Sequence, residues 1–191
     1  MNSFKMFTEL GFRHITDIHG YDHIIFLIAL CGVYTFRDWK KLLAVVTIFT
    51  ITHSLSLALA AFDVLRLKGD YIEFLIPVTI LFTALFNVTK LGSNKAGNAK
   101  VAISGLFGLV HGFGFSGFYR MIMLDSKPWY TSYLPFNLGI EMGQLVIVLV
   151  ILLISFTFQQ IFKVTLKSWN IFIAGGVSFI SITLILKNWP F

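Results

Sequence analysis

Six apolar segments, separated by short polar connectors, make up most of the chain. They cover roughly residues 21–36, 42–62, 71–89, 100–123, 133–162 and 169–187. A helix needs about 20 mostly apolar residues to cross a bilayer, and these segments reach or approach that length. The pattern therefore predicts an all-α integral membrane protein, a bundle of about six transmembrane helices that forms a single domain over residues 1–191.

The N-terminal segment, residues 1–19, shows a different pattern. Its apolar residues, among them Phe4, Phe7 and Leu10, interleave with Lys5 and Glu9. A short amphipathic pattern of this kind is typical of a helix that lies along a membrane surface. We expect this segment to be an interfacial helix on the bilayer.

The composition supports the membrane assignment. Hydrophobic residues make up 57% of the chain and charged residues 13%, and the mean hydropathy is +0.81, whereas a soluble domain is about 45–50% apolar and about 25% charged. The net charge of +6 comes largely from the connectors. Positive connectors follow from membrane orientation, so the charge gives no support to a role in nucleic-acid binding.

Six spans would place both termini on the same side of the membrane. Basic residues are nearly as numerous on that side as on the other, but opposite the termini they are denser and closer to span ends, as at Arg37, Lys40 and Lys41. Because basic connectors favour the cytoplasmic side, we expect the termini to be outside.

Glycines mark the fourth and fifth segments as close-packing surfaces. Gly139 and Gly143 form a GxxxG pattern in the fifth, and the fourth contains Gly105, Gly108, Gly112, Gly114 and Gly117. Small residues allow helices to approach closely in lipid. We expect helix packing at these glycine-rich faces, which are also where a second copy of the chain would dock in a homo-oligomer.

Ionisable residues within the apolar segments are few, and such residues are costly and usually functional. They are Asp22, His23, His53, Glu73, His111 and Glu141. At 1.5 Å of rise per residue, His53, His111 and Glu141 lie about 12–15 Å from the side of the termini. We therefore expect a pocket that opens to that side, with His14 and His19 at its entrance.

Imidazoles and carboxylates in this combination suit a borderline divalent cation such as nickel, cobalt or zinc. The absence of a cluster of cysteines or methionines argues against copper(I). The predicted metal ligands are His14, His19, Asp22, His23, His53, Glu73, His111 and Glu141. Polar neighbours that would hold the ligands in place are Ser54 beside His53, and Asn137 and Gln144, which share one helical face with Glu141.

Four segments, in this order along the chain, carry a family resemblance: GFRHITDIHGYDHIIFL, FTITHSLSLALAA, FGLVHGFGF and FNLGIEMGQ. They resemble motifs of the HupE/UreJ family of small bacterial membrane proteins, over nearly the whole length. The resemblance implies nickel or cobalt uptake at a bacterial inner membrane, and it points to His14, Asp22, His23, His53, Glu73, His111, Asn137 and Glu141. Seven residues separate His14 from Asp22, more than in the nickel-permease members, and FGLVHGFGF has a single histidine where those members have a second nearby. The chain therefore resembles the UreJ-like branch.

Three functions remain open from the sequence. The first is a divalent-metal permease or metal-transport component. The second is an intramembrane zinc hydrolase that acts on a lipid or lipid-linked substrate, with Glu73, Asp22 or Glu141 as general base. The third is a structural subunit without metal, whose buried polar groups only join helices.

Overall fold

The computed structural model describes residues 3–65, 67–89, 98–124 and 128–190. All regular structure in this part of the chain is helical, as predicted. The α-helices are α1 (Ser3–Thr16), α2 (Asp22–Cys31), α3 (Trp39–Ala61), α4 (Gly69–Val88), α6 (Asn98–Leu124), α7 (Tyr130–Gln160) and α8 (Leu166–Lys187), and a 3-10 turn, η1 (Phe36–Asp38), precedes α3.

In the described part of the chain, five helices are long and apolar enough to cross a membrane. They are α3 with its preceding turn, α4, α7 and α8 at full length, and the part of α6 that covers Asn98–Gly117. They correspond to the second to sixth apolar segments. The chain is therefore an integral membrane protein, and the predicted helical bundle is confirmed.

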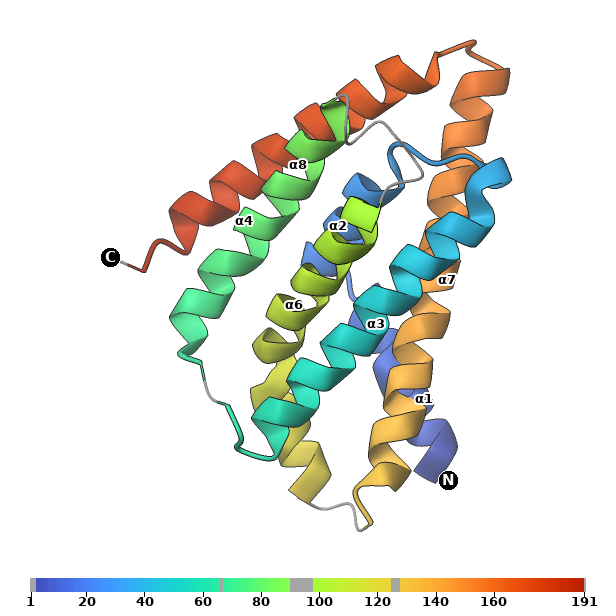
Figure 1. Cartoon of the computed structure of the whole chain (residues 1–191). Coiled ribbons are helices and arrows are strands. Elements are labelled where there is room, and N and C mark those ends of the chain that lie inside the picture. Colours follow the sequence, from blue (N-terminus) through green and yellow to red (C-terminus); the bar gives the residue numbers. More distant parts are fainter. Residues whose placement is uncertain (1–2, 66, 90–97, 125–127, 191) are drawn as a thin grey trace.

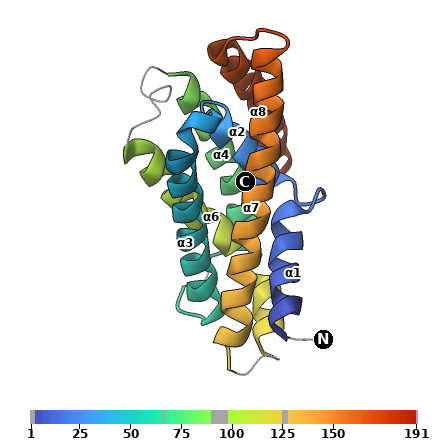
Figure 2. The ribbon, with the colours of Figure 1, turned by 90° about the vertical axis from the view of Figure 1, so that its right-hand side faces the viewer.

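The first expected span, residues 21–36, differs from the structure. Its helix, α2, has only ten residues, which give about 15 Å of rise, half the thickness of a bilayer core of about 30 Å. Figures 1 and 2 show α1 and α2 in succession along the height of the bundle, with a linker at mid-height. Together they cross the bundle as one broken helix.

Helix α1 is part of the bundle, not the separate surface helix that the amphipathic pattern suggested. It packs lengthwise on α7 so closely that a Cβ added at Gly11 would lie 2.0 Å from the carbonyl oxygen of Phe136, and one at Gly139 would lie 2.0 Å from that of Thr8. The buried stripe of α1 contains Phe7, Gly11 and Ile15. The apolar face was correctly identified, but its partner is α7.

Helices α3 and α6 make a second backbone contact through glycine. A Cβ at Gly108 would lie 2.4 Å from the carbonyl oxygen of Phe49, and one at Gly112 would lie 2.2 Å from that of His53. This contact fixes His53 beside His111. Gly108 and Gly112 are covered by α3, and Gly139 and Gly143 are covered by α1. These four glycines therefore offer no free surface on which a second copy of the chain could dock.

Helix α8 packs along α4 (Figure 1) and is bonded to it near both ends. The side-chain amide of Asn170 donates to the carbonyl oxygen of Asn87 at 2.8 Å, and that of Asn188 donates to the carbonyl oxygen of Glu73 at 3.2 Å. These contacts hold the end of α4 that carries Glu73 toward the linker between α1 and α2.

Candidate metal centre

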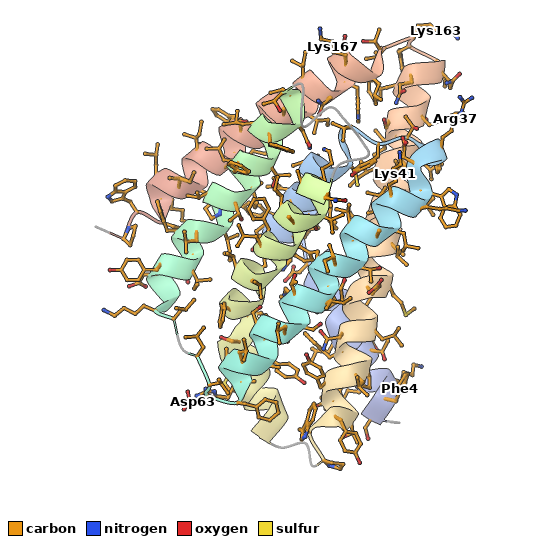
Figure 3. The ribbon with its side chains drawn as sticks, in the orientation of Figure 1. Phe4, Arg37, Lys41, Asp63, Lys163 and Lys167 are labelled. Carbon is orange, nitrogen blue, oxygen red and sulfur yellow. The ribbon has the colours of Figure 1, made fainter. Side chains whose placement is uncertain are left out.

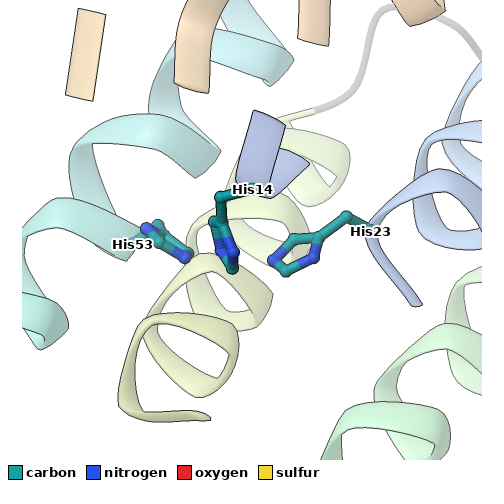
Figure 4. Close-up of side chains that lie close together, drawn as sticks. All are labelled: His14, His23 and His53. Carbon is teal, nitrogen blue, oxygen red and sulfur yellow. The ribbon is translucent and has the colours of Figure 1, made fainter. Parts of the chain in front are cut away.

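Three histidines from three different helices form the core of the site. His14 is in the last turn of α1, His23 is in the first turn of α2, and His53 lies within α3. One ring nitrogen from each can be chosen so that all three lie within 4.8 Å of one another. Figure 4 shows the three side chains close together, with His14 between His53 and His23 in this view. We call these three residues the histidine centre.

The rings of the histidine centre are close but not in hydrogen-bonding contact. The ring centroids of His14 and His23 are 4.9 Å apart, and the ring of His53 is 6.2 Å from the first and 6.0 Å from the second. Zinc binds imidazole at about 2.0–2.1 Å, which puts nitrogens of a tetrahedral site roughly 3.3 Å apart. Small side-chain rotations would therefore bring the three nitrogens onto one ion.

The ring nitrogens of this cluster are buried and have no hydrogen-bond partner in the described part of the chain. This holds for Nε2 of His14 and for both nitrogens of His23 and of His53. Buried polar atoms in proteins are nearly always bonded, and an unbonded one costs more in an apolar interior. Several such atoms facing one space indicate a ligand that accepts nitrogen lone pairs, as a metal ion does.

His111 of α6 adjoins the histidine centre. Its ring centroid is 5.3 Å from that of His23, and its Nδ1 lies 2.9 Å from the carbonyl oxygen of Phe107. A carbonyl only accepts, so Nδ1 carries the proton and Nε2 keeps its lone pair, which has no partner among the described residues. Metal-binding histidines are oriented by this kind of contact.

Two of the predicted acidic ligands lie at this site. Asp22 Oδ1 is 3.3 Å from His23 Nδ1, which is within ion-pair distance. A cavity of about 320 Å³ opens beside the centre, and its walls include both Asp22 and Glu73. The site therefore combines neutral nitrogen ligands with carboxylates that can balance the charge of a divalent cation.

His19 lies at the entrance and not in the centre. It is exposed in the linker, where its backbone N–H donates to Asp17 Oδ1 at 2.9 Å. It lines an adjoining cavity of about 490 Å³ that shares Asp22 and Glu73 with the first. The linker thus brings polar groups to the place where the broken helix is interrupted.

The polar face of α7 meets α3 instead of joining the histidine centre. Thr47 donates to Glu141 Oε1 at 2.7 Å, and Thr50 donates to Gln144 Oε1 at 2.6 Å. Ser54 and Asn137, which were also predicted to belong to the site, form the third pair of this interface. Ser54 donates to Asn137 Oδ1 at 2.5 Å. Ser54 therefore supports α7 and leaves the ring of His53 without the expected hydroxyl partner.

Two contacts of the site were not anticipated. The carbonyl of Phe107, which orients His111, lies four residues earlier on the same helix, so helical spacing could have indicated it. The ring of Phe115 packs on that of His14 with centroids 3.6 Å apart. Nothing in the sequence indicates that second contact, because it depends on how α1 packs against α6.

Comparison with known protein families identifies a relationship over nearly the whole chain. A family model described as HupE / UreJ protein matches residues 1–190, essentially the whole chain. No curated protein and no solved structure matches.

Proposed function

Because the chain belongs to the HupE/UreJ family, which is associated with nickel and cobalt transport, we propose that it is a divalent-metal permease or the metal-binding component of a transport system. The observation that carries this proposal is the set of buried, unpartnered imidazole nitrogens at the break between α1 and α2. The proposed cargo is nickel or cobalt, both of which accept imidazole and carboxylate ligands.

In the proposed complex, His14, His23 and His53 bind the ion through ring nitrogens. His111 adds its free Nε2 or holds a water molecule on the ion, and Asp22 supplies negative charge next to His23. Glu73 and His19 attract the ion into the cavity. Discontinuous helices commonly form the substrate sites of transporters, because interrupted backbone at mid-membrane is tolerated where it faces a site.

We propose that the cavity opens on the outer face of a bacterial inner membrane, in the half next to the N-terminus. Figure 3 shows Arg37, Lys41, Lys163 and Lys167 at the end of the bundle opposite Phe4. Basic residues at span ends favour the cytoplasmic side. The ion would then enter from outside and move toward the basic end, which is the direction of uptake.

The test is metal binding and metal movement by the purified protein. Elemental analysis of protein prepared without chelator should find nickel, cobalt or zinc, and liposomes that contain the protein should take up Ni²⁺ or Co²⁺ in a saturable way. His23→Ala and His53→Ala should remove the metal that stays bound through purification and abolish saturable uptake. Wild-type protein that binds no divalent metal would overturn the proposal and favour the structural-subunit interpretation.

A zinc hydrolase is the second candidate, and one observation favours it. Three imidazoles adjoin a cavity that also contains Asp22 and Glu73, which is the arrangement of a catalytic zinc with three protein ligands and a neighbouring base. Glu141, the third base considered, is bonded to Thr47 and is not among the residues that line the cavity. Zinc that stays bound through repeated assays, together with no uptake of Ni²⁺ or Co²⁺, would favour this candidate.

A further inference from the structure

We propose that Thr47, Thr50, Glu141 and Gln144 form a second ion-binding site, made of oxygen ligands, on the side of the histidine centre away from the cavity mouth. We call it the oxygen site. This inference rests on the proposed transport function and deepens it, because it assigns the next step of the ion toward the basic end of the bundle.

The first argument is position. Thr50 and Thr47 lie three and six residues before His53 on α3, so all three lie near one face, and Thr47 is about 9 Å of helix rise nearer the basic end. Both hydroxyls face α7, where they bond to Gln144 and Glu141. The oxygen site therefore begins one helical turn beyond the histidine centre.

The second argument is charge. Glu141 is a partly buried carboxyl within α7, and no ion pair among the described residues includes it. Its bonded partner is the neutral hydroxyl of Thr47. A carboxyl within a membrane span is costly and is usually retained for a function. A divalent cation would provide the positive charge that the protein does not supply at this position.

The third argument is an unpartnered amide. Gln144 is 0% exposed, and its Nε2 has no hydrogen-bond partner in the described residues. Half a turn about the last side-chain bond exchanges the two ends of an amide. Thr50 could then accept from the amide and donate to the carbonyl oxygen of Val46, which it already contacts at 3.3 Å. The unpartnered end would then be an oxygen, available to a cation.

The two sites differ in affinity for the ion, and the difference has the direction that transport toward the basic end requires. Imidazoles bind nickel and cobalt well, whereas hydroxyl and amide oxygens bind them more weakly. An ion crosses a membrane only where each site holds it firmly enough to enter and weakly enough to leave. An oxygen site that follows a nitrogen site meets both conditions.

Polar pairs between membrane helices can also serve only to join them, at about 0.6 kcal/mol each on average. Glu141→Gln separates the two roles, because glutamine keeps a hydrogen bond to Thr47 and loses only the charge. Ser54→Ala is the matched control, since it removes an uncharged pair from the same interface. Thr47→Val keeps the carboxylate and removes one oxygen ligand.

The experiment measures Co²⁺ binding by equilibrium dialysis and Co²⁺ uptake into liposomes for each variant. Wild-type protein should show a tight and a weaker class of site. Glu141→Gln should keep the tight class, lose the weaker one and take up Co²⁺ about tenfold more slowly, since the ligand charge sets the affinity of an oxygen site. His53→Ala should lose the tight class and keep the weaker, Thr47→Val should bind more weakly only at the weaker class, and Ser54→Ala should match the wild type.

Two results would overturn the oxygen site and leave the transport function standing. Uptake and stoichiometry of Glu141→Gln equal to those of the wild type would show that Glu141 only joins helices. A weaker tight class in Glu141→Gln would place its carboxylate in the histidine centre. Wild-type protein that neither binds nor moves Co²⁺ overturns both proposals at once.

Discussion

Two buried polar clusters of this protein differ in how completely their atoms are paired. In the histidine centre, five ring nitrogens have no hydrogen-bond partner among the described residues. Near the basic end, Lys100 is 4% exposed, yet its ammonium donates to Asn87 Oδ1, and the side chain of Asn87 donates to the carbonyl oxygen of Ala29 at 2.7 Å. We call Lys100, Asn87 and Asn170, which also bonds to Asn87, the lysine cluster.

The difference separates a structural role from a binding role. Hydrogen bonds within the protein offset the desolvation free energy of a buried polar group. Removing one partner leaves that free energy uncompensated and destabilises the fold. A buried group without a partner carries the cost in the folded protein and recovers it when a ligand binds. Mutation should therefore reduce stability at the lysine cluster and metal affinity at the histidine centre.

The largest expected effect is at the histidine centre. His53→Phe keeps an aromatic ring in the same space and removes both nitrogens. Loss of a supporting contact costs about 10–100-fold in metal affinity, and loss of the ligand itself should cost more, roughly 1,000-fold or about 4 kcal/mol. Calorimetric titration with Ni²⁺ or Co²⁺ measures it.

The stability of the metal-free variant sharpens the comparison. Because the removed nitrogens have no partner, His53→Phe should unfold at the same temperature as the wild type or a higher one, with a gain of up to about 1 kcal/mol. A clear loss of stability would mean that His53 contributes mainly by packing, and the contrast between the clusters would fail.

The next effect is at the lysine cluster. Asn87→Leu leaves the ammonium of Lys100 buried without its acceptor, which should lower the free energy of unfolding by about 3 kcal/mol. Thermal unfolding in detergent measures it. Metal affinity should not change, and adding Lys100→Met to the same protein should recover most of the loss, because the uncompensated charge is then gone.

Metal itself should act as a stabiliser of the wild type. An ion that binds only the folded chain at about 100 times its dissociation constant adds about 2.7 kcal/mol. Addition of Ni²⁺ should raise the unfolding temperature, and a chelator should reverse the rise. The rise should disappear in His53→Phe and persist in Lys100→Met, so a rise of equal size in both would argue against the histidine centre as the binding site.

The sequence allowed prediction of the ligand types but not of all their positions. His23 and His53 stand out because an ionisable residue in an apolar span is rare, and they do lie together. Glu141 stands out for the same reason, but the direction in which it faces depends on the rotation of α7. That rotation is set by α1, which occupies the glycine face of α7 and leaves Glu141 toward α3.

The role of α1 could not be read from its own pattern either. An amphipathic segment has one apolar face, and the sequence does not say whether lipid or another helix covers it. The GxxxG pattern of Gly139 and Gly143 indicated a close neighbour without naming it. The structure identifies that neighbour as α1, because Gly11 fits against Phe136 and Gly139 fits against Thr8.

The smallest predicted effect on metal affinity tests whether this helix contact builds the histidine centre. Gly139→Ala places a methyl group where the carbonyl oxygen of Thr8 is 2.0 Å away, so α1 must move and His14 with it. Metal affinity should fall about tenfold, or about 1.4 kcal/mol, because His23 and His53 stay in place. The lysine cluster lies far along the bundle and should be unaffected.

Gly175→Ala is the matched control, because a Cβ at Gly175 meets nothing within 4 Å. It adds the same methyl group to a membrane helix without moving a neighbour, so metal affinity should equal that of the wild type. If Gly139→Ala also binds metal like the wild type, α1 tolerates the displacement and His14 is not a ligand. The centre would then depend on His23, His53 and His111. Its ligands would come from the short helix α2 and from α3 and α6, which cross the bundle, and α1 would contribute none.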